Sequence, residues 1–179
     1  MAKEVGKTLV LGGARSGKSR YAQTLAAPAA SVLLVVTAEA GDDEMRAKIA
    51  RHRADRLADG LEHWVVREEP IALDACLVAG SCGLVLIDCL TFFVANLLAL
   101  EDEERDEAER LFLEALALYE GDVILVSNEA GQGVVPDYAS GRLFRDRLGE
   151  LNQKVAAICT DVVLMVAGLP LRLKGAGRR

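Results

Sequence analysis

Short runs of apolar, often β-branched residues alternate along the chain with longer segments in which apolar residues recur at helical spacing. The apolar runs predict buried strands at Thr8–Leu11, Val32–Thr37, Leu84–Ile87, Val123–Ser127 and Val162–Val166. Helical spacing predicts helices at Lys18–Ala27, Asp42–Leu57, Pro70–Ala79, Thr91–Leu118 with a break near Leu100, and Asp137–Cys159. Two shorter pieces are candidate edge strands, Trp64–Val66 and Leu171–Leu173. This alternation predicts an α/β fold, a mostly parallel central sheet with helices on both faces.

Composition narrows the class of protein. A length of 179 residues predicts one domain over residues 1–179. The formal net charge of −6 and the small aromatic content, with four Phe, three Tyr and one Trp, argue against a nucleic-acid partner. The longest apolar stretch, Leu84–Leu100, contains Asp88, Thr91 and Asn96 and is therefore not expected to span a membrane.

The four cysteines, Cys76, Cys82, Cys89 and Cys159, form no C-x-x-C pair and have apolar neighbours. We interpret them as small buried hydrophobic residues. No secretory leader pattern precedes them, so the expected compartment is the reducing cytoplasm.

One segment fits the phosphate-loop pattern G-x-x-x-x-G-K-[ST] at every defined position. Its residues are Gly12, Gly13, Ala14, Arg15, Ser16, Gly17, Lys18 and Ser19. Glycines allow backbone N–H groups to point at phosphate oxygens, Lys18 supplies a positive charge for the β- and γ-phosphates, and Ser19 offers a hydroxyl to Mg²⁺. Since a predicted strand enters the loop and a predicted helix leaves it, we expect a P-loop NTPase-like fold that binds a nucleoside triphosphate. The alternative is a chance glycine-rich turn.

An acidic residue, Asp88, ends the apolar run Leu84–Ile87. Phosphate-loop enzymes hold Mg²⁺ through such an acid on a neighbouring strand, so Ser19 and Asp88 are the candidate metal ligands. The alternative role for Asp88 is to cap the helix that begins near Thr91.

His52 falls on one helical stripe with Met45, Ile49 and Arg56. A lone histidine in that setting is more often a packing residue than a catalytic one. Positive charge from Arg51 and Arg53 would, however, lower the imidazole pKa and keep the ring neutral, the form that attacks phosphorus.

Two further segments have ordinary interpretations. The acidic run Glu101–Arg110 predicts a solvated helix face. The loop Asn128–Pro136 follows a predicted strand and carries Gly131 and Gly133, so it is either a glycine-rich connection or part of the ligand edge of the sheet.

Taken together, four ordered motifs resemble one family. They are the loop Gly12–Arg20, the stretch Asp42–Met45 leading to His52-Arg53, the segment Ile87–Thr91 with Asn96-Leu97-Leu98, and Ser127–Pro136. The chain resembles the bifunctional adenosylcobinamide kinase/adenosylcobinamide-phosphate guanylyltransferase family of cobalamin biosynthesis, from about Leu9 to Lys174.

The resemblance implies two reactions. A nucleoside triphosphate, ATP or GTP, phosphorylates the aminopropanol arm of adenosylcobinamide, and GTP then donates GMP to adenosylcobinamide phosphate. In the family GMP passes through a covalent bond to a histidine, which corresponds to His52 here, with Lys18 as the other catalytic residue. The resemblance also implies Mg²⁺ and a homotrimer.

Nucleotide contacts are implied by the same resemblance at the phosphate loop and at four further places. The positions outside the loop are Thr37, Ala38, Glu39, Arg53, Ala54, Asp55, Arg56, Glu68 and Asp88. Asn128 and Glu129 are candidates for contacts with substrate or metal.

Two other functions would use the same phosphate loop. A simple small-molecule kinase would transfer the γ-phosphate and leave His52 structural. A nucleotide-binding regulatory ATPase would instead act on a protein partner.

Overall fold

In the residues that the structure describes, 6–38, 60–78 and 83–175 of a computed structural model, seven strands form one sheet in the order β3-β2-β4-β5-β1-β6-β7. The strands are β1 (Lys7–Gly12), β2 (Val32–Val36), β3 (Val65–Glu68), β4 (Leu84–Asp88), β5 (Asp122–Asn128), β6 (Asp161–Val166) and β7 (Leu169–Lys174). Neighbouring strands are parallel, except that β7 pairs antiparallel with β6. The mostly parallel sheet is therefore confirmed, and both candidate edge strands are present as β3 and β7.

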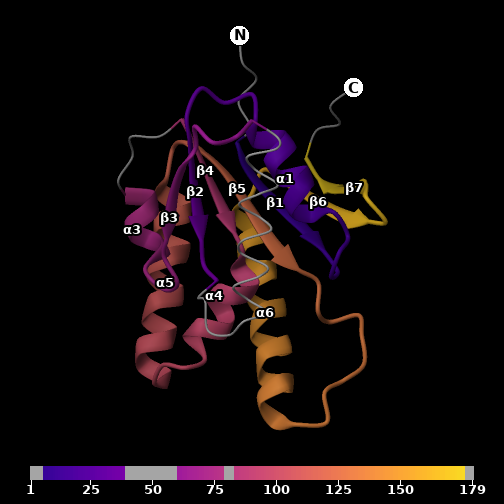
Figure 1. Cartoon of the computed structure of the whole chain (residues 1–179). Coiled ribbons are helices and arrows are strands. Elements are labelled where there is room, and N and C mark those ends of the chain that lie inside the picture. The colour runs from indigo at the N-terminus through magenta and orange to yellow at the C-terminus, as the bar shows by residue number, and fades with distance from the viewer. Residues whose placement is uncertain (1–5, 39–59, 79–82, 176–179) are drawn as a thin grey trace.

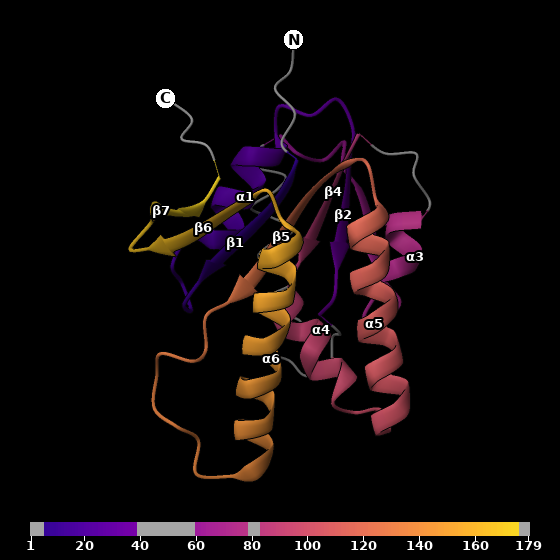
Figure 2. The ribbon, with the colours of Figure 1, turned by 180° about the vertical axis from the view of Figure 1, so that it is seen from behind.

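Helices cover both faces of the sheet (Figures 1 and 2). The described helices are α1 (Lys18–Ala26), α3 (Leu73–Val78), α4 (Leu90–Leu97), α5 (Asp102–Leu118) and α6 (Ala139–Ile158). The break predicted near Leu100 separates α4 from α5. Helix α3 begins later than the predicted Pro70 and α6 later than Asp137, while the helix predicted at Asp42–Leu57 lies outside the described residues.

Each central strand sends alternate side chains to opposite faces, and both faces are apolar. On β5, Val123 and Leu125 belong to the core beneath α3, α4, α5 and α6, whereas Ile124 and Val126 belong to the core that α1 covers. All four side chains are fully buried. This two-sided burial explains why these strands are continuous apolar runs rather than alternating ones.

Three of the cysteines, Cys76, Cys89 and Cys159, are buried free thiols, as predicted; Cys82 lies outside the described residues. Burial raises the pKa of Cys89, with a further contribution from Asp88, and raises the pKa of Cys159 to about 12. These thiols stay protonated near neutral pH and act as packing groups.

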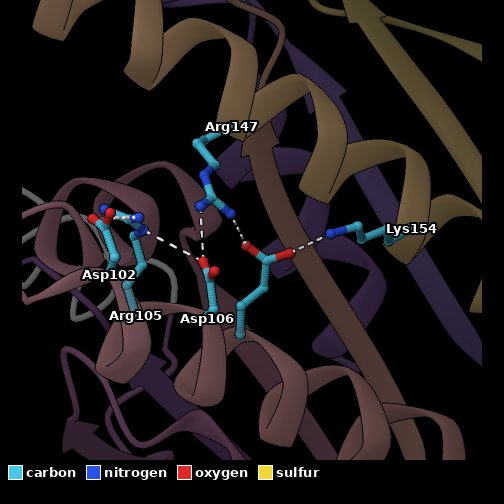
Figure 3. Close-up of polar contacts among 6 residues, drawn as sticks. Asp102, Arg105, Asp106, Arg147 and Lys154 are labelled. Atoms are coloured by element: carbon cyan, nitrogen blue, oxygen red, sulfur yellow. Dashed lines mark hydrogen bonds and ion pairs between the residues drawn. The ribbon is translucent and has the colours of Figure 1, made fainter.

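The acidic helix α5 differs in part from the predicted solvated face. Arg105 and Glu109 are buried. Arg105 pairs with Asp102 of its own helix at 2.7 Å. Glu109 accepts a bond of 2.6 Å from Lys154 of α6, and Asp106 accepts one of 2.7 Å from Arg147 of the same helix (Figure 3). Glu109 can be buried in this contact because it meets the opposite charge of Lys154 on the facing helix. Among the described helices, none combines the length and the apolar character needed to cross a membrane.

Candidate functional site

The phosphate loop joins β1 to α1. Gly17, the N-cap of α1, has a left-handed φ of 91°, and Arg15 has a φ of 57°. A side chain at Gly17 would be strained by this φ, and its Cβ would come within 3.4 Å of Gly168. The loop is closed by a 3.3 Å bond from Ser16 N to Gly13 O. The helix start therefore faces the loop without a capping side chain in the space that an anion would occupy.

Lys18 lies over the loop rather than away from it. Its Nζ donates a hydrogen bond of 3.1 Å to Gly13 O. This holds the ammonium group above the backbone that would surround a phosphate, so the predicted role of Lys18 fits the geometry.

Ser19 and Asp88 are brought together although 69 positions separate them in the sequence. Helix α1 packs over β1, β5 and β4, and the Ser19 hydroxyl donates to Asp88 Oδ1 at 3.5 Å. Neighbouring ligand oxygens on octahedral Mg²⁺ are about 3 Å apart, so these two oxygens fit one ion. Within the described ranges, His, Cys, Asp and Glu form no group of three or more suited to a metal. Two protein oxygens suit Mg²⁺, which takes its remaining ligands from phosphate and water.

Thr37 follows β2 and is fully buried beside the segment that ends β4. Its backbone N–H donates to Asp88 O at 3.3 Å, and its hydroxyl donates to Cys89 O at 2.6 Å while accepting from Cys89 N at 2.9 Å. Asn96 of α4 donates from Nδ2 to Thr37 O at 2.8 Å and to Pro70 O at 3.1 Å. The predicted nucleotide-contact residue Thr37 therefore binds its protein neighbours through all of its polar groups.

Asn128, at the end of β5, lies between two helices. Its N–H donates to Thr91 Oγ1 of α4 at 3.0 Å, and its carbonyl accepts from Asn152 Nδ2 of α6 at 3.0 Å. The next residue, Glu129, donates from its N–H to Gly12 O at 3.1 Å. Asn128 Oδ1 is buried with no hydrogen-bond partner among the described residues. This free acceptor beside the phosphate loop agrees with Asn128 as a candidate ligand contact.

Glu68 ends β3, at the edge of the sheet away from the loop. Strands β2, β4 and β5 lie between β3 and β1, which puts Glu68 about 19 Å from Gly12 at the usual strand spacing. A contact at Glu68 would therefore involve a part of the ligand remote from the phosphates.

The neighbouring residue, Glu69, has a structural function. Its Oε1 accepts from Ala72 N at 2.9 Å and from Ile71 N at 3.3 Å, where the chain turns toward α3. Burial alone would raise the pKa of Glu69, but these two amides and Arg67 outweigh it and lower the pKa.

Six of the predicted site residues lie outside the described residues: Glu39, His52, Arg53, Ala54, Asp55 and Arg56. The roles of His52 and of Glu39, Arg53, Ala54, Asp55 and Arg56 stay predictions. The structure brings together the phosphate loop with Ser19, Asp88 and Thr37 at the carboxyl ends of the parallel strands β1, β4 and β2. Sequence reasoning assigned no role to Thr91, Asn96 or Asn152, because their partners are backbone groups that carry no sequence signal.

Comparison with known proteins shows which family the chain belongs to. Residues 8–173 match the family model described as cobinamide kinase / cobinamide phosphate guanyltransferase. The chain is 49% identical over 175 residues to the bifunctional adenosylcobalamin biosynthesis protein CobP of Pseudomonas aeruginosa, covering 94% of this chain and 98% of that protein. It is 36% identical to the protein CobU of Salmonella typhimurium, which bears the same description, over 93% of this chain and 98% of the relative.

Solved structures with low sequence identity share the fold. The flagellar accessory protein FlaH of Methanocaldococcus jannaschii aligns with a TM-score of 0.53 and 14% identity, covering 96% of this chain and 79% of FlaH. The protein PH0250 of Pyrococcus horikoshii aligns with a TM-score of 0.56 and 8% identity, covering 98% and 89%. The architecture is P-loop NTPase-like.

Proposed function

The chain belongs to the cobinamide kinase / cobinamide phosphate guanyltransferase family, and we propose that it performs both reactions at one nucleotide site on the phosphate loop. It is an enzyme of cobalamin biosynthesis. The observation that supports one shared nucleotide site is the contact between Ser19 and Asp88 beside a complete phosphate loop. We further propose that residues 1–179 form one nucleotide-binding and transferase domain.

In the kinase reaction, the hydroxyl of the aminopropanol arm of adenosylcobinamide attacks the γ-phosphorus of ATP or GTP. The bond from the γ-phosphorus to the bridging oxygen breaks, the nucleoside diphosphate leaves, and the proton of the attacking hydroxyl passes to water. Lys18 is placed to stabilise the charge that develops on the β- and γ-phosphates. Mg²⁺, held by Ser19 and Asp88, would neutralise further phosphate charge.

In the guanylyl transfer, a neutral His52 imidazole nitrogen attacks the α-phosphorus of GTP, and pyrophosphate leaves. A phosphate oxygen of adenosylcobinamide phosphate then attacks the same phosphorus. The bond from nitrogen to phosphorus breaks, which gives adenosylcobinamide-GDP and frees His52. The support for His52 is the resemblance of the His52-Arg53 motif.

The proposed nucleotide site extends beyond the loop. It takes in Ala38 and Glu39, the residues Arg53–Arg56 and Glu68, with Asp88 beside the phosphates and the buried Thr37 next to Asp88. Because Glu68 lies far from Gly12 along the sheet edge, it suits the nucleoside end of GTP rather than its phosphates.

We also propose a homotrimer in the cytoplasm. Leu169, Leu171 and Leu173 of the edge strand β7 are more than half exposed and offer apolar surface that another copy would cover. The buried free thiols are in keeping with a reducing compartment.

Labelling tests the covalent step directly. Incubation with GTP labelled at the α-phosphate and Mg²⁺ is expected to leave acid-labile, base-stable label on the protein, and mass spectrometry should find a GMP-sized adduct on the peptide containing His52. The variant His52→Ala should lose the label, since it lacks the nucleophile.

The exposed histidine His63 provides the matched control. His63→Ala should retain full labelling. Label that persists in His52→Ala would remove His52 as the nucleophile. A protein that phosphorylates adenosylcobinamide but never retains GMP would instead be a simple kinase without the covalent intermediate.

A further inference from the structure

Thr37 holds the peptide group that follows the proposed metal ligand Asp88. Both polar groups of the Asp88–Cys89 peptide bind Thr37: Asp88 O accepts from Thr37 N at 3.3 Å, and Cys89 N donates to Thr37 Oγ1 at 2.9 Å. The hydroxyl also donates to the next carbonyl, Cys89 O, at 2.6 Å. A single buried residue, through its backbone N–H and its hydroxyl, therefore fixes the backbone on the carboxyl side of Asp88.

Asn96 fixes Thr37 in turn. The two hydrogens of its Nδ2 bind two carbonyls from different segments, Thr37 O at 2.8 Å and Pro70 O at 3.1 Å. Because α4 begins at Leu90, directly after the held peptide, Asn96 ties the end of β2 to the helix that Asp88 leads into. Thr37 and Asn96 thus form a chain of hydrogen bonds around the Asp88 backbone.

This arrangement bears on how Thr37 acts. Its side chain is fully buried, and its N–H, hydroxyl and carbonyl each bind the protein. Direct contact with a nucleotide would require at least one of these bonds to be shared or broken. The Asp88 carboxylate, by contrast, lies 3.5 Å from the Ser19 hydroxyl, so a small shift of the Asp88 backbone would separate the two oxygens that fit one Mg²⁺.

We propose that Thr37 and Asn96 are positioning residues, which act on the nucleotide through Asp88 by holding its carboxylate next to Ser19. The inference rests on the proposed function, because it requires a Mg²⁺-nucleotide at the phosphate loop. It assigns Thr37 an indirect contribution to that site and Asn96 a role beyond helix packing.

The test compares nucleotide binding with and without metal. Isothermal calorimetry would measure the affinity for an α,β-methylene analogue of GTP, which cannot donate GMP, first in excess Mg²⁺ and then in EDTA. The ratio of the two affinities reports the contribution of the metal, whereas the affinity in EDTA reports the contacts of the loop with the nucleotide alone.

Thr37→Val keeps the shape of the side chain and removes the hydroxyl, and Asn96→Leu removes the two donors. In both variants the ratio should fall about tenfold or more, the usual effect of losing a group that orients a metal ligand, while the affinity in EDTA stays unchanged. Thr37→Ser keeps the hydroxyl and should retain the wild-type ratio.

Thr8→Val is the control for loss of a buried threonine hydroxyl. Thr8 is buried near the amino end of β1, away from the phosphate loop, so its substitution should leave the ratio unchanged. Circular dichroism melts check that each variant is folded. If Thr37→Val does not fold, the affinity ratios of Asn96→Leu and Thr37→Ser are compared with that of the wild type instead.

Three results would overturn the inference. Equal losses with and without Mg²⁺ in Thr37→Val would mean that Thr37 contacts the nucleotide itself. An unchanged ratio in both Thr37→Val and Asn96→Leu would mean that the hydrogen bonds serve folding alone. Wild-type protein that fails to bind the analogue at all would overturn the proposed function, and with it this inference.

Discussion

The contact between α5 and α6 and the carboxyl edge of the sheet both bury polar side chains, but the partners differ. Between the helices, charges pair with opposite charges, as Glu109 does with Lys154 (Figure 3). At the sheet edge, neutral groups bind backbone: Thr37 binds Cys89, and Asn96 binds two carbonyls. Neutral groups can fix strand ends without adding charge that would compete with phosphate or metal. Ion pairs therefore join α5 to α6, whereas hydrogen bonds of uncharged side chains hold the strand ends around the candidate site.

The largest expected effect is at the loop. Lys18→Met should lower both the kinase and the guanylyl-transfer rates by about 10²- to 10³-fold, because the ammonium group stabilises charge in each transition state. The melting temperature should change little, since the hydrogen bond from Lys18 to the carbonyl of Gly13 is exposed and water can replace it. Rate assays and thermal melts measure the two properties.

Lys154→Met is the matched control for Lys18→Met and should show the reverse pattern. Lys154 pairs with the buried Glu109, so its loss should lower the melting temperature and leave the rates unchanged. Normal turnover by Lys18→Met would contradict the division between the two regions.

Next in size is the charged contact. Arg147→Met removes a hydrogen bond to Asp106 at 2.7 Å and an ion pair with Glu109 at 3.7 Å. It should lower the free energy of unfolding by about 1–2 kcal/mol, because the buried Glu109 carboxylate loses one of its two cations. Urea unfolding measures this change.

Arg110→Met is the control. It breaks two exposed ion pairs on α5, with Glu107 and Glu114, and should lower the free energy of unfolding by less than Arg147→Met does. Equal effects would show that burial does not strengthen the contact between the helices.

The smallest expected effect is at Glu69, which caps the turn before α3. Glu69→Gln should lower the free energy of unfolding at pH 7 by about 1 kcal/mol through weaker bonds to two amides. Because folding lowers the pKa of Glu69, the stabilisation is fully present above the ordinary pKa of 4.5 and is lost as pH falls through the folded pKa.

Urea unfolding at a series of pH values measures the Glu69 contribution. The gap in unfolding free energy between wild type and Glu69→Gln should close as the pH falls below 4.5. Arg67→Met should remove only part of the gap, because both backbone amides remain. If the difference in unfolding free energy stayed constant as the pH fell below 4.5, the bonds from the two amides would not be the cause of the lowered pKa of Glu69.

Local patterns were enough to predict the sheet, the phosphate loop and the nearness of Ser19 to Asp88. A strand, a glycine-rich motif and an acid at a strand end have sequence signatures, and parallel strands bring such ends to one edge. Asn96 and Asn152 have no such signature. Their partners are main-chain carbonyls 59 and 24 positions away, and only the finished topology selects them. The burial of Glu109 could not be predicted either, because the cations that pair with it, Arg147 and Lys154, lie on the facing helix. Arg105 is buried beside acidic residues of its own helix, and the acidic run does not distinguish it from its exposed neighbours.

Two hydrogen bonds hold Glu129: its backbone N–H donates to Gly12 O, and its carboxylate accepts from the backbone N–H of Gly131 at 2.8 Å. The exposed stretch that leads on to α6 is therefore anchored at its first residues as well as at the end of β5. Gly12 opens the triphosphate cradle, so the cradle and the start of this stretch share one hydrogen bond and cannot shift apart without breaking it.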